Sequence, residues 1–351
     1  MHLTVKGTLF STIFGLLLSG TASASANIPK VVTDIPITHS LVTRVMAGIG
    51  MPDLIVDRGA SPHEYSLRPS NAASLEAADL VFWISNGLTP WLDDALNTLA
   101  RNAKVIELMD AKGATVLSFR EGATFETHSH QHKHDEDGHD EDKHDEDKHD
   151  EDGHDEDKHD EDKHDEDKHD EDGHDEDEHA TGNVDPHGWL DPYNGRIWLD
   201  VIATALSKID PTNSDIYFAN ATQAKADIDT VISELEETLA EFRGTNFIVY
   251  HDAYQYFEKR FDVLAAGSIS LGDVSDPSPA RIAEVRKKVE ELGITCVFSE
   301  PQFNSELVRT VSDGVSVKTR VIDPLGTQFT LGPDFYLNVL RGIAQSMASC
   351  L

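Results

Sequence analysis

The sequence predicts an α/β fold: two βα lobes with parallel sheets, joined by one long rigid helix, with a metal site in the cleft between the lobes. Short β-branched runs alternate with helical patterns along most of the 351 residues, which is typical of parallel sheets covered by helices. A continuous helical pattern at 213–243 divides this alternation into two series. A charged tract at 128–179 interrupts the first series, and its lack of any apolar residue predicts a disordered insertion.

The first βα series precedes the charged tract. Pro36 opens a helical pattern in which Ile37, Leu41 and Val45 share one face. Ser70 is expected to be the N-cap of a second helix. The expected strands are 30–33, 53–57, 79–84 and 104–108, and the second and third helices are expected to end at 78 and to span 91–101.

The second series follows the tract. A helix is expected at 194–209, and Pro211 breaks the chain before the long helix. Apolar residues from Phe218 to Phe242 recur at steps of three and four, and at about 1.5 Å per residue this helix would span about 45 Å. The later strands are expected at 246–250, 263–266, 294–299 and 318–322, with helices at 253–261, 279–292, 305–313 and 334–349.

These elements predict an N-terminal lobe at 27–210, a linker helix at 211–243 and a C-terminal lobe at 244–351. Residues 1–26 have the pattern of a signal peptide, with a positive charge at Lys6, a short apolar core and the small residues Ala24-Ser25-Ala26 before the expected cleavage. No apolar run is long enough to span a membrane, and no cysteine near the cleavage point offers a lipid anchor. We therefore expect a monomer that is free in a bacterial periplasm.

The formal charge of −35 is concentrated in the tract. Residues 128–179 contain six Lys against 28 Asp and Glu, a charge of −22, so the rest of the chain carries −13. That remainder is moderately acidic and has no basic patch. The charge distribution argues against nucleic acid or an anionic membrane surface as a partner.

Cys296 and Cys350 are the two cysteines of the chain, and an exported protein most simply joins them in a disulfide. Closing this loop would stabilise the fold by about 4 kcal/mol in the loop-entropy account. A metal site made of the two thiolates is the weaker alternative, because every histidine motif is distant in the sequence.

The tract repeats the unit His-Asp-Glu-Asp, followed by Lys or Gly, with little variation from 134 to 179. Imidazole beside carboxylate is a ligand set for borderline divalent metals, and ordering an unfolded chain would make such sites weak. The alternative is a solvated acidic linker, which has no use for a histidine at every fifth position. The candidate weak ligands are His128, His130, His132, His134, His139, His144, His149, His154, His159, His164, His169, His174 and His179.

Three isolated histidines, His63, His187 and His251, fall in loops that follow expected strands. Ligands of open α/β sheets bind at the carboxyl ends of strands, where such loops meet. Taken singly, each histidine is more often a hydrogen-bonding loop residue than a ligand. Together, and beside a metal-collecting tract, they predict a Zn²⁺ site of three imidazoles with a fourth position open.

Four motifs resemble one family. They are the stretch from Gly59 to Ser70 (GASPHEYSLRPS), the stretch from Asp185 to Pro192 (DPHGWLDP), Tyr250-His251-Asp252-Ala253-Tyr254, and Asp323-Pro324-Leu325-Gly326. Together they resemble the ZnuA-like family of high-affinity zinc-uptake solute-binding proteins, which belong to the metal-binding cluster of ABC-transporter receptors. A charged, His-rich insertion before the second motif is also typical of the zinc members.

The resemblance implies that His63, His187 and His251 are zinc ligands. In manganese-binding relatives the position of His251 is Glu and the aspartate matching Asp323 also coordinates, so a histidine there favours zinc. Some zinc members have Glu just before the first ligand, but this chain has Pro62. Water or Asp323 would then complete the site, and we favour water, with Asp323 near the metal as a hydrogen-bonding partner of its ligands.

The expected function is to capture Zn²⁺ in the periplasm and deliver it to an inner-membrane ABC permease and its ATPase, with no reaction catalysed. One alternative is a zinc hydrolase, since three histidines and a water can also activate a nucleophile. Against it, His63-Glu64 is not followed by a second histidine in the spacing His-Glu-x-x-His. A stand-alone periplasmic metal buffer is the other alternative.

Overall fold

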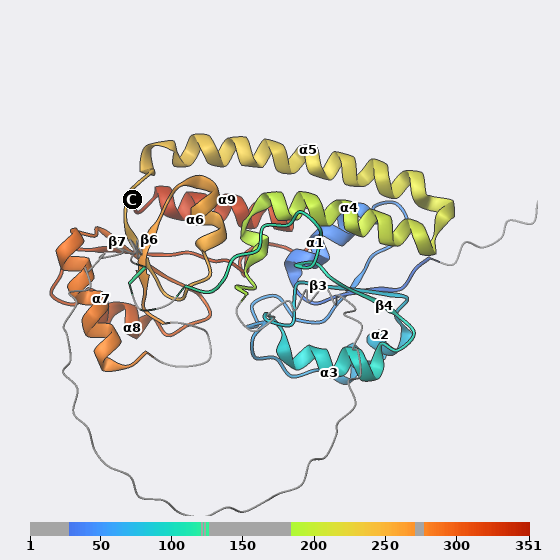
Figure 1. Ribbon diagram of the computed structural model, residues 1–351, viewed down its shortest axis with the longest axis horizontal. Helices are drawn as coiled ribbons and strands as arrows, with labels where there is room; N and C mark the ends of the chain where they lie inside the picture. Colours follow the sequence, from blue (N-terminus) through green and yellow to red (C-terminus); the bar gives the residue numbers. More distant parts are fainter. Residues whose placement is uncertain (1–27, 121, 123, 126–183, 271–276) are drawn as a thin grey trace, which may run out of the picture.

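The computed structural model describes residues 28–120, 122, 124–125, 184–270 and 277–351. The expected signal peptide and the His-rich tract with its thirteen histidines lie outside these residues. The described residues form two four-stranded parallel sheets flanked by helices (Figure 1). This architecture confirms the predicted pair of α/β lobes.

The first sheet has the strand order β2-β1-β3-β4, with every neighbour parallel. The central strands β1 and β3 are buried throughout, which explains their continuous apolar sequence, whereas β4 at the edge is partly exposed. Its strands are β1 (Val31–Thr33), β2 (Asp53–Leu54), β3 (Leu80–Trp83) and β4 (Lys104–Glu107), and its helices are α1 (Pro36–Val45), α2 (Pro69–Ala77) and α3 (Pro90–Leu99).

The second sheet repeats this order as β6-β5-β7-β8, again with all neighbours parallel. Its strands are β5 (Phe247–Val249), β6 (Ala265–Ser268), β7 (Cys296–Ser299) and β8 (Lys318–Val321). The helices that follow them are α6 (Gln255–Phe261), α7 (Pro279–Leu292), α8 (Ser305–Ser312) and α9 (Phe335–Ala348). Loops after the first and third strands of each half therefore lie at the switch point of its sheet, where open α/β folds bind ligands.

Two helices connect the halves. The helix α4 (Pro192–Ile209) leads through the short 3₁₀ turn Pro211–Asn213 into α5 (Ser214–Leu239), which ends in a second 3₁₀ turn at Ala240–Phe242. The helix α5 runs along the top of both lobes in Figure 1 and packs against α1, α4 and α9. At about 1.5 Å per residue its 26 residues span about 39 Å, so one rigid element supports both halves.

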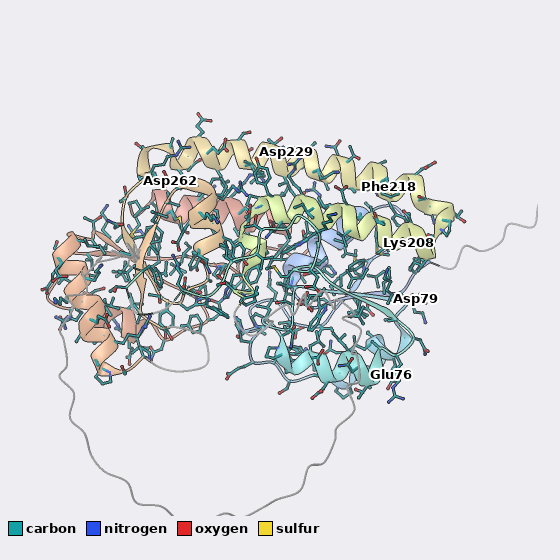
Figure 2. All side chains as sticks on the ribbon, viewed as in Figure 1. Glu76, Asp79, Lys208, Phe218, Asp229 and Asp262 are labelled. Atoms are coloured by element: carbon teal, nitrogen blue, oxygen red, sulfur yellow. A yellow bond between two sulfur atoms is a disulfide. The ribbon has the colours of Figure 1, made fainter. Side chains whose placement is uncertain are left out.

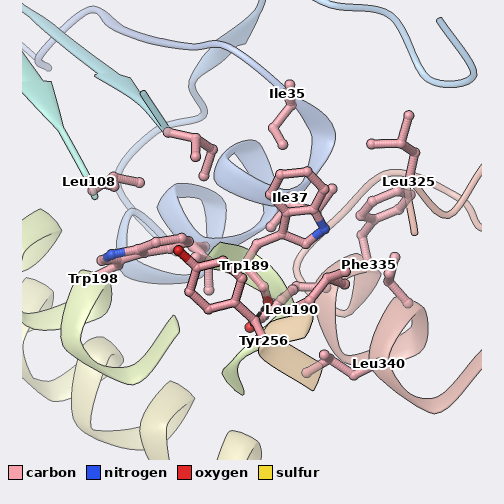
Figure 3. Packing of buried hydrophobic residues seen from close by; sticks show 14 of the residues in the cluster. Ile35, Ile37, Leu108, Trp189, Leu190, Trp198, Tyr256, Leu325, Phe335 and Leu340 are labelled. Atoms are coloured by element: carbon pink, nitrogen blue, oxygen red, sulfur yellow. Dashed lines mark hydrogen bonds between the residues drawn. The ribbon is translucent and has the colours of Figure 1, made fainter. Parts of the chain in front are cut away.

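The main apolar core is continuous across the two lobes. Figure 3 shows Trp189 and Trp198 packed with Ile37 of α1, Tyr256 of α6 and Phe335 of α9. A separate, smaller core lies under α7 and α8. Because the lobes share one close-packed interior, a large rotation of one against the other would have to break that interior.

Two details of the sequence prediction are wrong. The second helix begins at Pro69 with Arg68 as its N-cap, and the side chain of Asn71 accepts the backbone N–H of Arg68 at 3.1 Å, so Ser70 is not the cap. Phe218 is 43% exposed on α5 (Figure 2), whereas Tyr217 is buried and donates its hydroxyl to Asp210 at 2.8 Å. The buried face of this helix is therefore displaced by one residue at its start.

The predicted disulfide between Cys296 and Cys350 is present, with 5.8 Å between the two Cα atoms. It joins β7 to the chain just after α9, and Lys318 of the adjacent strand β8 donates to the carbonyl of Cys350 at 3.0 Å. Because the two sulfur atoms are bonded to each other, the alternative of a metal site made of two thiolates is excluded in this structure. None of the helices in the described part of the chain is both long and apolar enough to cross a membrane.

Candidate metal centre

A pocket lies between the two halves, and all three isolated histidines line it. The space inside it is about 10 Å³, far below the roughly 300–1,000 Å³ of pockets that hold drug-sized ligands, so a small solute fits it best. Segments far apart in the sequence form its wall: Ser61, Pro62, His63, His187, Trp189, His251, Glu300, Gln302, Phe303, Pro324 and Leu325.

His63 lies in the loop between β2 and α2, and neighbouring side chains hold that loop in place. The indole of Trp91 on α3 donates to the carbonyl of Pro62 at 2.7 Å, and its ring packs against Tyr65. The backbone N–H of His63 donates to the hydroxyl of Ser61 at 3.3 Å. The first lobe thus presents this imidazole to the pocket from an anchored loop.

His187 is 5% exposed and is oriented by Asp185, which is fully buried. The Asp185 carboxylate accepts the imidazole Nδ1–H at 2.6 Å and the backbone N–H of His187 at 2.9 Å. Since an ionised carboxylate can only accept, this contact favours a proton on Nδ1, which leaves Nε2 as the coordinating nitrogen of a neutral ring. The Nε2 atom is buried and has no hydrogen-bond partner among the residues that the structure describes. A buried acceptor without a partner is rare in a native protein and points to a missing ligand.

His251 follows β5 and is oriented in the same way from the second lobe. The carboxylate of Glu300, just after β7, accepts its Nδ1–H at 2.7 Å, and Glu300 is 3% exposed. The ring of Phe303 lies edge-on to the imidazole at 5.3 Å and stacks on Tyr250 at 4.4 Å. Both strands belong to the switch point of the second sheet, so strand order brings His251 and Glu300 together.

The three rings are neighbours in space. The ring centroids of His63 and His187 are 5.5 Å apart, and those of His187 and His251 are 5.3 Å apart. Three imidazoles that share one zinc ion at about 2.0–2.1 Å would have centroids roughly 5 Å apart. Within the described ranges, no group of three or more His, Cys, Asp or Glu side chains could hold an ion in its present arrangement. Small rotations of the rings are therefore needed to close a shell.

Asp323 is directed elsewhere. Its carboxylate accepts the backbone N–H of Leu325 at 3.1 Å, and the N–H and hydroxyl of Thr327 at 2.6 and 2.7 Å. It lines a different pocket, together with Thr327 and Phe329, and does not line the pocket of the three histidines. In this arrangement the carboxylate stabilises the turn after β8.

Side chains of both lobes also fix the loop of His251. Arg120, from the segment that leads toward the His-rich tract, donates its Nε–H to both carboxylate oxygens of Asp252 at 3.0 Å. The same guanidinium donates to both oxygens of Glu258 at 2.7 and 2.9 Å. Burial raises the pKa of the Glu258 carboxyl, and the guanidinium opposes that rise. The first half of the chain thereby holds the residue next to a candidate ligand of the second half.

A second cross-link reaches the carboxylate behind His187. Gln255, the first residue of α6, donates its amide to Asp185 at 2.6 Å and to the carbonyl of Ser118 at 2.9 Å. The hydroxyl of Tyr256 donates to the carbonyl of Asp185 at 2.8 Å. The loops that carry two of the three histidines are therefore tied to each other.

The sequence interpretation missed two residues of this centre. Glu300 lies at the carboxyl end of β7, the kind of position that singles out the histidines in the sequence, and this position is the signal for its role. Asp185 was noted as part of a motif, and its position two residues before His187 is the signal for its role. The pairing of His251 with Glu300 cannot be read from sequence distance, because 49 residues separate them.

Comparison with known proteins assigns the chain to a protein family. The family ZnuA, described as "Zinc-uptake complex component A periplasmic", matches residues 31–350. The high-affinity zinc uptake system protein ZnuA of Brucella abortus (strain 2308) is 46% identical over 321 residues, which are 92% of this chain and 91% of that protein. The protein of the same name from Paracoccus denitrificans (strain Pd 1222) is 43% identical over 335 residues, 95% of each chain.

Among solved structures, a crystal structure of ZnuA has a TM-score of 0.67 at 20% identity, covering 92% of this chain and 99% of that one. This likeness supports the fold. The family match and the two relatives confirm the resemblance seen in the motifs. The chain belongs to the ZnuA family, the periplasmic component A of zinc-uptake complexes.

Proposed function

We propose that this protein captures Zn²⁺ with His63, His187 and His251 and delivers it to an inner-membrane ABC permease and its ATPase. The observation that supports the ligand set most strongly is the Nε2 atom of His187, which is buried and has no hydrogen-bond partner in the described part of the chain. Imidazole is a preferred ligand of Zn²⁺, and three imidazoles leave one coordination position for a further ligand.

The charges of the site suit a divalent cation. Asp185 and Glu300 are buried carboxylates on the far side of two imidazoles, and together they balance the two positive charges of one zinc ion. Each carboxylate also fixes the ring orientation and makes the coordinating nitrogen more basic. The protein would act in the periplasm as a monomer, after removal of the signal peptide at 1–26.

A water molecule is the fourth ligand in this proposal. Pro62 occupies the position just before His63, and the carboxylate of Asp323 is held in the turn by Leu325 and Thr327. A receptor that must release its ion gains from a site that one exchangeable ligand completes, since replacing water requires no rearrangement of the protein.

Competition titration against a strong chelator tests the ligand set. We expect His63→Ala, His187→Ala and His251→Ala each to lower zinc affinity by more than the roughly 10–100-fold that loss of an outer hydrogen-bonding partner costs. The matched control is His39→Gln, because His39 is a buried histidine that contacts the carbonyl of Pro52 away from the pocket.

The same titration separates water from Asp323. Asp323→Asn is expected to change zinc affinity by no more than a few-fold. A loss as large as that of a histidine variant would make Asp323 a ligand, and near wild-type affinity in any histidine variant would remove that histidine from the proposed set.

The two alternatives are not favoured. The family is one of solute receptors that serve a transporter, so a hydrolase and a stand-alone buffer both lack support. The pocket volume also leaves little room for an organic substrate beside the ion.

A further inference from the structure

Gln302 is a side chain of the pocket to which the proposed function gives no role. It lines the same cavity as His63, His187 and His251. Its amide oxygen and its amide nitrogen are both buried, and neither has a hydrogen-bond partner among the residues that the structure describes. Leaving both ends of an amide unpaired in a protein interior is costly, so a partner absent from the protein is expected there.

The position of Gln302 is determined by its neighbours. It follows Glu300, which orients His251, and Pro301, whose ring restricts the backbone. On its other side Phe303 is held by its stack on Tyr250. The side-chain amide of Gln302 therefore lies in the pocket on a segment that Glu300 and Phe303 hold at its two ends.

The chemistry of the amide selects its partner. A glutamine side chain offers one oxygen acceptor and two N–H donors, whereas the zinc ligands of proteins are thiolate, imidazole and carboxylate. A water molecule on zinc is a strong hydrogen-bond donor and requires an acceptor nearby. Neutral imidazoles whose Nδ1–H is already given to a carboxylate cannot accept from that water, but the oxygen of Gln302 can.

We propose that Gln302 is a positioning residue for the fourth zinc ligand: its amide oxygen accepts a hydrogen bond from the zinc-bound water. This proposal rests on the proposed zinc site. Its consequence is that Gln302 contributes to zinc affinity without touching the ion.

The test compares three variants of the full-length mature protein. Gln302→Leu removes both polar ends at similar size, Gln302→Glu supplies a carboxylate that can coordinate zinc itself, and Gln345→Leu is the matched control on the exposed face of α9. Zinc affinity is measured by chelator competition, the zinc environment by X-ray absorption, and the melting temperature is measured for the metal-free and zinc-loaded forms.

For Gln302→Leu we expect zinc affinity to fall about 10-fold, as for other outer hydrogen-bonding partners of metal sites, with an altered oxygen shell and three imidazoles retained. The metal-free variant should melt no lower than wild type, because an unpaired buried amide has been removed; a purely structural role would lower it. Gln302→Glu should restore or exceed wild-type affinity, and Gln345→Leu should match wild type.

Wild-type zinc affinity and an unchanged absorption spectrum in Gln302→Leu would overturn this proposal and leave the three-histidine site intact. A spectrum in which the Gln302 oxygen itself is bound to zinc in wild type would also overturn it. If the wild-type protein binds no zinc tightly, the proposed function itself is wrong, and the role of Gln302 is wrong as well.

Discussion

Each imidazole of the candidate metal centre is positioned by a specific neighbour. Asp185 and Glu300 accept the Nδ1–H groups of His187 and His251, and both carboxylates are buried behind their histidines. His63 depends instead on an anchored loop, in which the Trp91 indole holds the carbonyl of Pro62. These neighbours therefore fix the approximate orientation of the rings, and small ring rotations would complete a coordination shell.

Substituting either orienting carboxylate should weaken zinc binding less than substituting a histidine. We expect Asp185→Asn and Glu300→Gln each to weaken zinc binding roughly 10–100-fold, less than the loss of His187, because the ligand remains but its orientation and basicity are reduced. Asp94→Asn and Glu291→Gln are exposed controls. The measurement is chelator competition at one pH. If the zinc affinity of both variants equals that of the controls, the two carboxylates do not support the imidazoles as proposed.

Glu107, at the end of β4, gives a prediction about stability. Burial, followed by the charge of Asp110, raises the pKa of this carboxyl from its ordinary 4.5 to about 7. The folded state thus holds a proton that the unfolded state releases, so the group destabilises the fold increasingly as the pH rises from about 4.5 to 7. The neutral substitution Glu107→Gln should remove that cost.

The expected gain for Glu107→Gln at pH 8 is about 1 kcal/mol, less than the pKa difference alone implies because solvent screens the partly exposed side chain. It should shrink toward zero near pH 4.5. Denaturant titrations of wild type and variant at both pH values measure this, with the exposed Glu76→Gln as control (Figure 2). If the gain in the free energy of unfolding does not depend on pH, the pKa of Glu107 is not raised in the folded state.

At the scale of elements, the sequence predicted the helices and strands of the described residues better than their ends. The alternation of β-branched runs and amphipathic patterns is a property of many residues together, whereas a cap depends on one hydrogen bond. Asn71 accepts the N–H of Arg68, and Tyr217, whose hydroxyl donates to Asp210, is buried in place of Phe218. Two adjacent aromatic residues give no periodic signal that separates them.

The helix α9 also links the two halves. It follows the second sheet in the sequence, packs against α1 of the first lobe and against α5, and is joined to β7 by the bond between Cys296 and Cys350. The disulfide therefore closes a loop whose ends are also held by packing.

Removing the disulfide should lower stability and spare the metal site. For the double variant Cys296→Ser, Cys350→Ser we expect the free energy of unfolding to fall by about 4 kcal/mol, and zinc affinity to stay within a few-fold, because neither cysteine lines the pocket. Denaturant titration and chelator competition measure the two effects. Two free thiols in the unfolded, unreduced wild-type protein would contradict the disulfide itself.

At the scale of the whole molecule, one core shared by two lobes limits how the protein can respond to zinc. Residues of α1, α6 and α9 meet around Trp189 (Figure 3), and Arg120 and Gln255 add polar links across the cleft. We infer that loading and release involve small movements of the histidine loops, and that large rotations of the lobes are not part of them.

The insertion leaves and re-enters this core at neighbouring points. Ser118 and Val184 form an antiparallel bridge, and the N–H of Asp185 donates to the carbonyl of Leu117 at 2.8 Å. This pairing lies outside 128–179, so we expect it to persist in a protein that lacks the tract.

The measurement that tests the central claim most directly is zinc calorimetry on the mature protein, on the protein without 128–179, and on the shortened protein carrying His187→Ala. The cleft histidines are held by a packed core, whereas ordering the tract would offset part of each ion's binding energy. We predict one tight zinc site in both the full-length and the shortened protein, loss of several weaker sites on shortening, and loss of the tight site with His187→Ala. If shortening the protein removes the tightest site and leaves only weak ones, the tract is the receptor and the assignment of the cleft is wrong.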